Sequence, residues 1–162
     1  MDMKYNTNIK LGLTPICHTE FPNIVISFND TEVFSGALTA PRVFEIDKNL
    51  SIGEHCLEVL FNNKTDLDTV PEKNLDKAVL IDFVKFENMD IDRTKWAGIY
   101  EPVYPEFWYN QQVTQGSTPE KFLKNSTYLG WNGVWRLTFQ SPVYTWIHKL
   151  ENLGWIYNLD QE

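Results

Sequence analysis

Apolar residues recur at every second position through much of the first 90 residues, and this period of two most constrains the fold. Ile24, Ile26 and Phe28 fall on one face of an extended segment, because successive side chains of a strand point to opposite faces. The Asn-Asp pair that follows tolerates the positive φ angles of a tight turn. The sequence therefore predicts a β-hairpin over residues 23–35.

The next segments continue this pattern. Residues 42–47 are expected to form a third strand, followed by a turn over residues 51–54. Leu57, Val59 and Phe61 then line one face of a fourth strand, and the opposite face is also largely apolar. Since a strand with two apolar faces is covered on both sides, we expect this one to be central in its sheet.

Two later segments have equally clear strand character. Residues 78–86, with the sequence AVLIDFVKF, are rich in β-branched and aromatic residues, so we expect them in the middle of a sheet. Residues 131–139 place Trp, Gly, Trp, Leu and Phe on one face and form a late strand.

A short helix is predicted after this last strand. Ser141 is a candidate N-cap, Pro142 suits the first helical position, and Gly154 is a candidate stop. The whole is expected to be one mostly-β sandwich domain, jelly-roll-like, over residues 1–162, with its core at about 5–92 and 127–140, an irregular aromatic segment at 94–126, and the helix at about 142–152.

Composition narrows the class of function. The chain has 162 residues, 43% of them hydrophobic, which suffices for one substantial core. Its formal net charge of -8 repels phosphate backbones and anionic membranes, so nucleic acid and membrane are not expected as partners. Without a secretory signal pattern we expect Cys17 and Cys56 to be thiols.

The sequence shows no pattern typical of an enzyme. His18, His55 and His148 are isolated, and no catalytic or zinc-binding motif surrounds any of them. A carboxylate pair for glycoside hydrolysis cannot be chosen from sequence, because the pair must share a cleft. We therefore expect no catalytic residues, and a hydrolase is the third hypothesis.

The long polar loop between the fourth strand and residues 78–86 is one candidate site, because loops of this length often bind something. Its hard oxygen ligands would suit calcium. Because the loop lacks the residue spacing of an EF-hand, we expect its polar side chains to be ordinary solvated ones that bind no cofactor. A calcium site is the alternative. The candidate ligands are Asn62, Asn63, Asp66, Asp68 and Asp76.

Aromatic residues of the irregular segment are the second candidate site, since flat rings can stack on sugars or insert into a protein partner. The alternative is that they belong to the core, which is what we expect of Trp131, Trp135 and Trp146. The candidate binding residues are Trp96, Tyr100, Tyr104, Trp108 and Tyr109.

Three motifs resemble the small calcium-dependent, xylan-binding type of carbohydrate-binding module. They are the hairpin IVISFNDTEVFSG, the strand GEHCLEVLFNN and, after the Asp-rich loop, the strand AVLIDFVKFENMDI. The resemblance covers less than half of the chain and implies a β-sandwich or jelly roll. It also implies calcium in loops beside the last of these strands, with sugar hydroxyls completing its coordination.

The C-terminal stretch LGWNGVWRLTFQSPVYTWIHKLENLGW resembles small accessory virion proteins of tailed marine phages. This resemblance implies a non-catalytic structural or accessory protein of the tail, baseplate, neck or capsid, assembled in the host cytoplasm and located in the virion. Its expected partners are other virion proteins, further copies of itself as a homo-oligomer, and a host-surface glycan as an added contact. The alternative is a soluble calcium-dependent carbohydrate-binding module.

Overall fold

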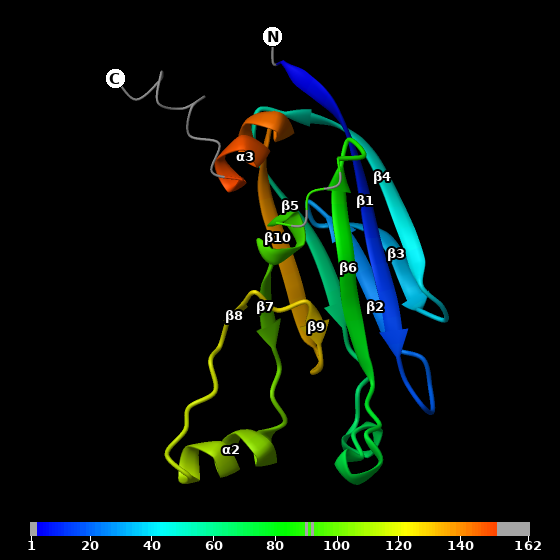
Figure 1. The fold of residues 1–162 in the computed structure, drawn as a ribbon, viewed down its shortest axis with the longest axis vertical. Helices are drawn as coiled ribbons and strands as arrows, with labels where there is room; N and C mark the ends of the chain where they lie inside the picture. The colour runs from blue at the N-terminus through cyan, green and yellow to red at the C-terminus, as the bar shows by residue number, and fades with distance from the viewer. Residues whose placement is uncertain (1–2, 90, 92, 152–162) are drawn as a thin grey trace.

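The computed structural model describes residues 3–89, 91 and 93–151 and consists of two antiparallel β-sheets packed face to face (Figure 1). The strands are β1 (Lys4–Ile16), β2 (Asn23–Phe28), β3 (Thr31–Ala37), β4 (Arg42–Ser51), β5 (Gly53–Phe61), β6 (Ala78–Phe86), β7 (Ile99–Pro102), β8 (Leu123–Lys124), β9 (Tyr128–Leu129) and β10 (Gly133–Ser141), and the helices are α1 (Arg93–Trp96), α2 (Glu106–Thr114) and α3 (Val143–Leu150). One sheet has the order β4-β1-β6-β9 and the other β3-β2-β5-β10-β7-β8. The predicted mostly-β sandwich is confirmed.

One hydrophobic core fills the space between the sheets. The period of two in the sequence explains it, since every second side chain of a strand points inward. Ile9, Leu11 and Leu13 of β1 and Leu57 and Val59 of β5 are all completely buried. Each such side chain stabilises the fold by roughly 1.5–3 kcal/mol relative to an exposed one.

The hairpin predicted over residues 23–35 is present as β2 and β3. Asn29 and Asp30 form its turn with φ angles of 48° and 67°. The amide of Asn29 also accepts a hydrogen bond from the backbone N–H of Cys56 at 2.9 Å, which ties the turn to β5. The predicted central positions of β5 and β6 are confirmed by the strand orders, and both Cys17 and Cys56 are free.

Strands β1, β4 and β5 differ from the prediction. β4 continues to Ser51 and β5 begins at Gly53, so the turn expected over residues 51–54 is much tighter. β1 was not recognised as a strand, although it lies between β4 and β6 at the centre of its sheet. It alternates as the other strands do, but polar residues occupy its first half and hide the pattern there.

The predicted C-terminal helix is present as α3. Ser141 is the last residue of β10 instead of a helix cap, and the chain turns into α3 through a cis peptide bond to Pro142. Val143 and Ile147 are buried, and Trp146 packs edge-on against rings of the core, as its helical spacing suggested. The predicted stop at Gly154 lies outside the described residues.

The segment 94–126 is more regular than predicted, because it contains α2. None of the residues of this helix is buried, so its sequence EFWYNQQVT has no apolar stripe that could reveal it. Figure 1 shows α2 at the same end of the sandwich as the loop between β5 and β6. No described helix has the length and apolar character needed to cross a membrane.

Candidate functional site

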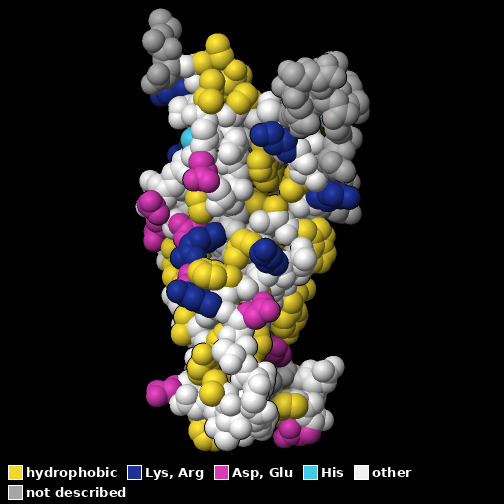
Figure 2. Space-filling view, turned by 90° about the vertical axis from the view of Figure 1, so that its left-hand side faces the viewer, with side chains coloured by type: hydrophobic (Ala, Val, Ile, Leu, Met, Phe, Trp, Pro, Cys, Tyr) yellow, Lys and Arg dark blue, Asp and Glu magenta, His cyan; other side chains and the backbone are white. Residues whose placement is uncertain are grey.

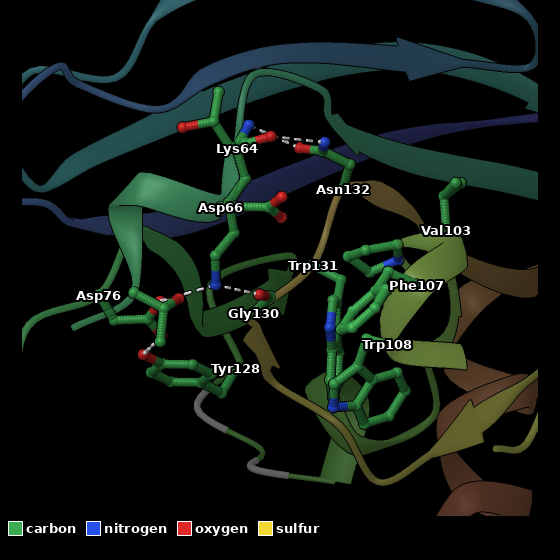
Figure 3. A pocket seen from close by; sticks show the side chains of 13 residues that line it. Lys64, Asp66, Asp76, Val103, Phe107, Trp108, Tyr128, Gly130, Trp131 and Asn132 are labelled. Atoms are coloured by element: carbon green, nitrogen blue, oxygen red, sulfur yellow. Dashed lines mark hydrogen bonds and ion pairs between the residues drawn. The ribbon is translucent and has the colours of Figure 1, made fainter. Parts of the chain in front are cut away.

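A cleft of about 510 Å³ lies at this end of the sandwich. Three connections build it: the β5–β6 loop, the chain from β7 into α2, and the chain from β9 into β10 (Figures 1 and 3). Its volume is within the range of sites that hold small organic ligands, which is roughly 300–1,000 Å³. The lining residues are Lys64, Thr65, Asp66, Thr69, Asp76, Val103, Pro105, Phe107, Trp108, Tyr128, Gly130, Trp131 and Asn132.

Aromatic rings form one wall of the cleft. Trp108 of α2 lies 5.4 Å from Trp131, measured between ring centroids, and Figure 3 shows both beside Phe107. Tyr104 supports this pair, stacking on Trp108 at 5.2 Å and meeting Trp131 edge-on at 5.1 Å. The side chain of Phe107 is 81% exposed, so this wall offers apolar surface to a ligand.

Trp131 is held in place through its backbone. The hydroxyl group of Tyr100 donates to the backbone oxygen of Trp131 and accepts from its N–H at 3.0 Å. Tyr100 itself is completely buried, and this burial raises the pKa of its phenol, although the hydrogen bond to Trp131 partly opposes the rise. The neutral phenol therefore fixes the aromatic wall to the core of the sandwich.

Asn132 joins the two walls. Its side-chain oxygen accepts from the backbone N–H of Lys64 at 2.8 Å, and its side-chain amide donates to the backbone oxygen of Lys64 at 3.0 Å. Its own backbone oxygen accepts from Val103 at 2.6 Å. One residue thus connects the β5–β6 loop to the segment that leads into α2, which fixes the width of the cleft.

Polar side chains form the opposite wall, which centres on Asp76 (Figure 3). Its carboxylate accepts hydrogen bonds from Lys64 Nζ at 2.6 Å, from Thr69 at 2.7 Å and from the Tyr128 hydroxyl at 2.6 Å. Burial alone would raise the pKa of Asp76, but the hydrogen bonds from Lys64, Tyr128 and Thr69 outweigh it and lower the pKa. Burial and the Asp76 carboxylate raise the pKa of Tyr128. Asp76 is therefore ionised and Tyr128 neutral at pH 7.

A second ion pair anchors the loop behind this wall. Lys77 Nζ lies 3.5 Å from Asp68 Oδ2, and the two side chains are only 2% and 6% exposed. Asp68 also accepts from the backbone N–H of Thr65 at 2.7 Å and from the Thr19 hydroxyl at 3.2 Å. Burial would raise the pKa of Asp68, but these hydrogen bonds and Lys77 lower it.

The structure separates the side chains that were candidates for a calcium site. Asp66, Asp68 and Asp76 do not form a group able to hold a metal ion, and neither do other His, Cys, Asp or Glu residues in the described part of the chain. Asn62 is exposed, and Asn63 instead fastens the loop to the start of β2, accepting from the backbone N–H of Asn23 at 2.8 Å.

The carboxylates of Asp68 and Asp76 do not fit a calcium ion, because each already has a lysine ammonium as its cation. Of the predicted loop residues, Asp66 and Asp76 line the cleft and the others do not. The predicted loop therefore lines a cleft, and the pairing of Asp68 and Asp76 with lysines does not fit the calcium site that was the alternative prediction for this loop.

The aromatic candidates also divide. Trp108 lines the cleft, and Tyr104 supports it from behind. Tyr109 lies 6.2 Å from Tyr104, at the edge of the same cluster. Tyr100 has no surface to offer a ligand because it is completely buried, and Trp96 is 42% exposed on α1 but does not line the cleft.

Several lining residues were missed by the sequence analysis. Trp131 continues the alternation of β10, which predicts a core position, and its half-buried side chain does pack against the core; it also precedes the strand and lines the cleft. No sequence pattern indicates a binding role for Lys64, Tyr128 or Asn132, because polar and aromatic residues in loops are common. An aromatic followed by Asn directly before a strand, as in Trp131-Asn132, is the one local feature that could have been noticed.

Side chains of both charges occur on the surface of the sandwich. On the face drawn in Figure 2, Lys and Arg side chains are mixed with Asp, Glu and hydrophobic side chains. The formal net charge of the chain is -8, a sign that repels phosphate backbones.

No protein-family model matches the chain, and no curated protein matches it either. Among solved structures, the module vCBM60 in complex with galactobiose is similar with a TM-score of 0.48 and 13% identity, covering 82% of this chain and 97% of that one. The selenomethionine form of vCBM60, described in connection with two families of calcium-dependent carbohydrate-binding modules, has a TM-score of 0.49 and 14% identity, covering 81% and 89%. At these values the likeness says nothing about what this chain binds.

Proposed function

We propose that this chain is a carbohydrate-binding module that holds a neutral oligosaccharide in the cleft between the aromatic wall and the polar wall. One observation carries the proposal: exposed aromatic rings and a network of hydrogen-bonding side chains face each other across one cavity (Figure 3). A binding site of this kind is mostly apolar, with a few placed polar groups that set orientation.

The chemistry of a sugar matches both walls. A pyranose ring has a face of C–H groups that packs on an aromatic ring, and Trp108 and Trp131 offer such surfaces. Its hydroxyl groups both donate and accept hydrogen bonds, so they can pair with the exposed Asp66 carboxylate and the Tyr128 hydroxyl oxygen. A neutral ligand also suits a chain of formal net charge -8, which would repel a polyanion.

The geometry favours binding over hydrolysis. Glycoside hydrolysis generally needs two carboxyl groups, one of which stays protonated to act as an acid. Asp66 and Asp76 are the acidic residues of the cleft lining, and Asp76 is held ionised by Lys64, Thr69 and Tyr128. It cannot supply a proton at neutral pH, so the cleft has at most one carboxylate free for chemistry.

Titration of the purified chain with a panel of neutral oligosaccharides, including galactobiose and xylohexaose, tests this proposal by calorimetry. We expect saturable binding of at least one member without release of shorter sugars. Trp108→Ala should weaken it by about thirtyfold, since an aromatic anchor at the centre of a site contributes about 2 kcal/mol. Trp96→Ala is the matched control, because that side chain is exposed outside the cleft, and it should bind as the native chain does.

Two results would count against the proposal. If no member of the panel binds, the cleft is not a site for neutral sugars of this kind. If Trp96→Ala weakens binding as much as Trp108→Ala, the sugar is held elsewhere. A role in virion assembly stays a prediction of the sequence, and mass spectrometry of purified phage particles would test it.

A further inference from the structure

The polar wall of the cleft already contains a cation. Lys64 Nζ donates to Asp76 Oδ1 at 2.6 Å and to the backbone oxygen of Gly130. The Lys64 and Asp76 side chains are only 13% and 24% exposed. A carboxylate and a backbone carbonyl are the oxygen ligands that calcium takes in proteins. Here the ammonium group of Lys64 lies between them, where such an ion would have to bind.

Asp76 has no coordination left for a metal. A carboxylate offers about four lone-pair positions. Lys64 and Thr69 donate to one of its oxygens and Tyr128 to the other, and the backbone of Lys77 donates as well. A calcium ion would have to displace several of these donors, all of which also shape the cleft.

We propose that Lys64 is the cationic centre of the cleft and that the chain binds its sugar without a divalent metal ion. The proposal rests on the proposed function. An ammonium group has three N–H donors, and acceptors among the described residues take two of them. Because the Lys64 side chain lines the cleft, its third N–H donates to an oxygen atom of the bound sugar. The lysine thereby does what a metal ion does in a calcium-dependent site, with a single charge that chelators cannot remove.

Binding of galactobiose and xylohexaose is measured in millimolar calcium and again after dialysis against excess EDTA. We expect the same affinity in both buffers for whichever sugar binds. The melting temperature of the sugar-free chain should also be the same in both, because an ion that bound the native state would raise it. Loss of binding in EDTA that calcium restores, or a calcium-dependent rise in melting temperature, would overturn the inference and leave the proposed function standing.

Substitutions at position 64 test the role of the ammonium group. Lys64→Met keeps most of the length of the side chain and removes the ammonium group, so sugar affinity should fall at least about tenfold. Lys73→Met is the matched control, because it removes an equally charged, exposed side chain from the same loop outside the cleft lining, and it should leave affinity unchanged.

A Lys64→Met variant that binds as the native chain does would also overturn the inference. Circular dichroism shows whether the variant is folded, and Lys64→Arg provides a second measurement that keeps the charge. Because a planar guanidinium group cannot take the place of the compact ammonium group between Asp76 and Gly130, we expect an affinity between those of the native chain and Lys64→Met. Failure of every sugar to bind in either buffer would instead refute the proposed function, on which this inference rests.

Discussion

Replacing Lys77 by methionine should lower the free energy of unfolding by about 3 to 5 kcal/mol, because it leaves the buried carboxylate of Asp68 without its cation. Methionine retains most of the apolar volume of the lysine side chain, so the loss is mainly electrostatic. At the observed separation of 3.5 Å, two unit charges attract by about 5 kcal/mol at an effective dielectric constant of about 20. For a chain of this size the melting temperature should fall by roughly 6–20 °C.

Urea unfolding followed by circular dichroism at several pH values measures the effect. The pKa of Asp68 is lowered from its ordinary value of 3.8, so the ion pair stabilises the fold fully well above that pH. Its contribution is lost as the pH falls through the folded-state pKa, and the difference between the native chain and Lys77→Met should shrink there.

Two comparisons make this prediction refutable. Adding Asp68→Asn to Lys77→Met removes the unpaired charge and should restore part of the lost stability, since contacting residues are coupled by about 0.5–3 kcal/mol. Lys73→Met, in the exposed part of the same loop, should change stability by less than about 0.5 kcal/mol. If Lys77→Met were as stable as Lys73→Met at neutral pH, the buried pair would not be what anchors the loop.

Two further predictions concern the packing of β10 against β7 and the effect of acid on the stability of the fold. Gly133→Ala should destabilise the fold by at least about 1 kcal/mol more than Gly53→Ala, as urea unfolding would show. Both glycines have positive φ angles, of 156° and 127°, but a Cβ atom at Gly133 would clash with the backbone oxygen of Glu101 on β7, whereas at Gly53 it meets open space. Equal losses would contradict this explanation. The contribution of Asp68 and Asp76 to stability should be constant above about pH 5 and fall as the pH drops through 3.8, because the pKa values of both carboxyl groups are lowered from 3.8 in the folded state. A stability that rises on acidification would show that these carboxylates are not held as ions.

The sandwich could largely be predicted because burial imposes a period of two on strands. β2, β5 and β10 follow it closely. The position of β3 is predicted by the hairpin turn before it, and that of β6 by its β-branched and aromatic residues. β1 is not predicted as a strand because the polar residues of its first half obscure the alternation. α2 is not predicted for a different reason. A helix that buries none of its residues needs no apolar stripe, so apolar residues do not recur at helical spacing in its sequence.

Asp66, Asp76 and Trp108 are the candidate residues from the sequence that line the cleft, and the other candidates do not. The β5–β6 loop was recognised because a long polar loop between central strands is unusual, and Trp108 because aromatic residues gather near it. The partners of Asp68 and Asp76 depend on which lysine the fold brings to each carboxylate, and spacing along the chain does not encode that. Lys64 contacts Gly130 across 66 residues, a pairing that only the closed sandwich creates.

Mapping a bound oligosaccharide by the NMR signals of the tryptophan indole N–H groups tests the central claim most directly. On titration with the member of the panel that binds, the signals of Trp108 and Trp131 should shift together and saturate, because both rings line the cleft. The signals of Trp96, exposed outside the cleft, and Trp135, completely buried, should stay in place. Shifts at Trp96 without any at Trp108 and Trp131 would place the sugar elsewhere and contradict the account.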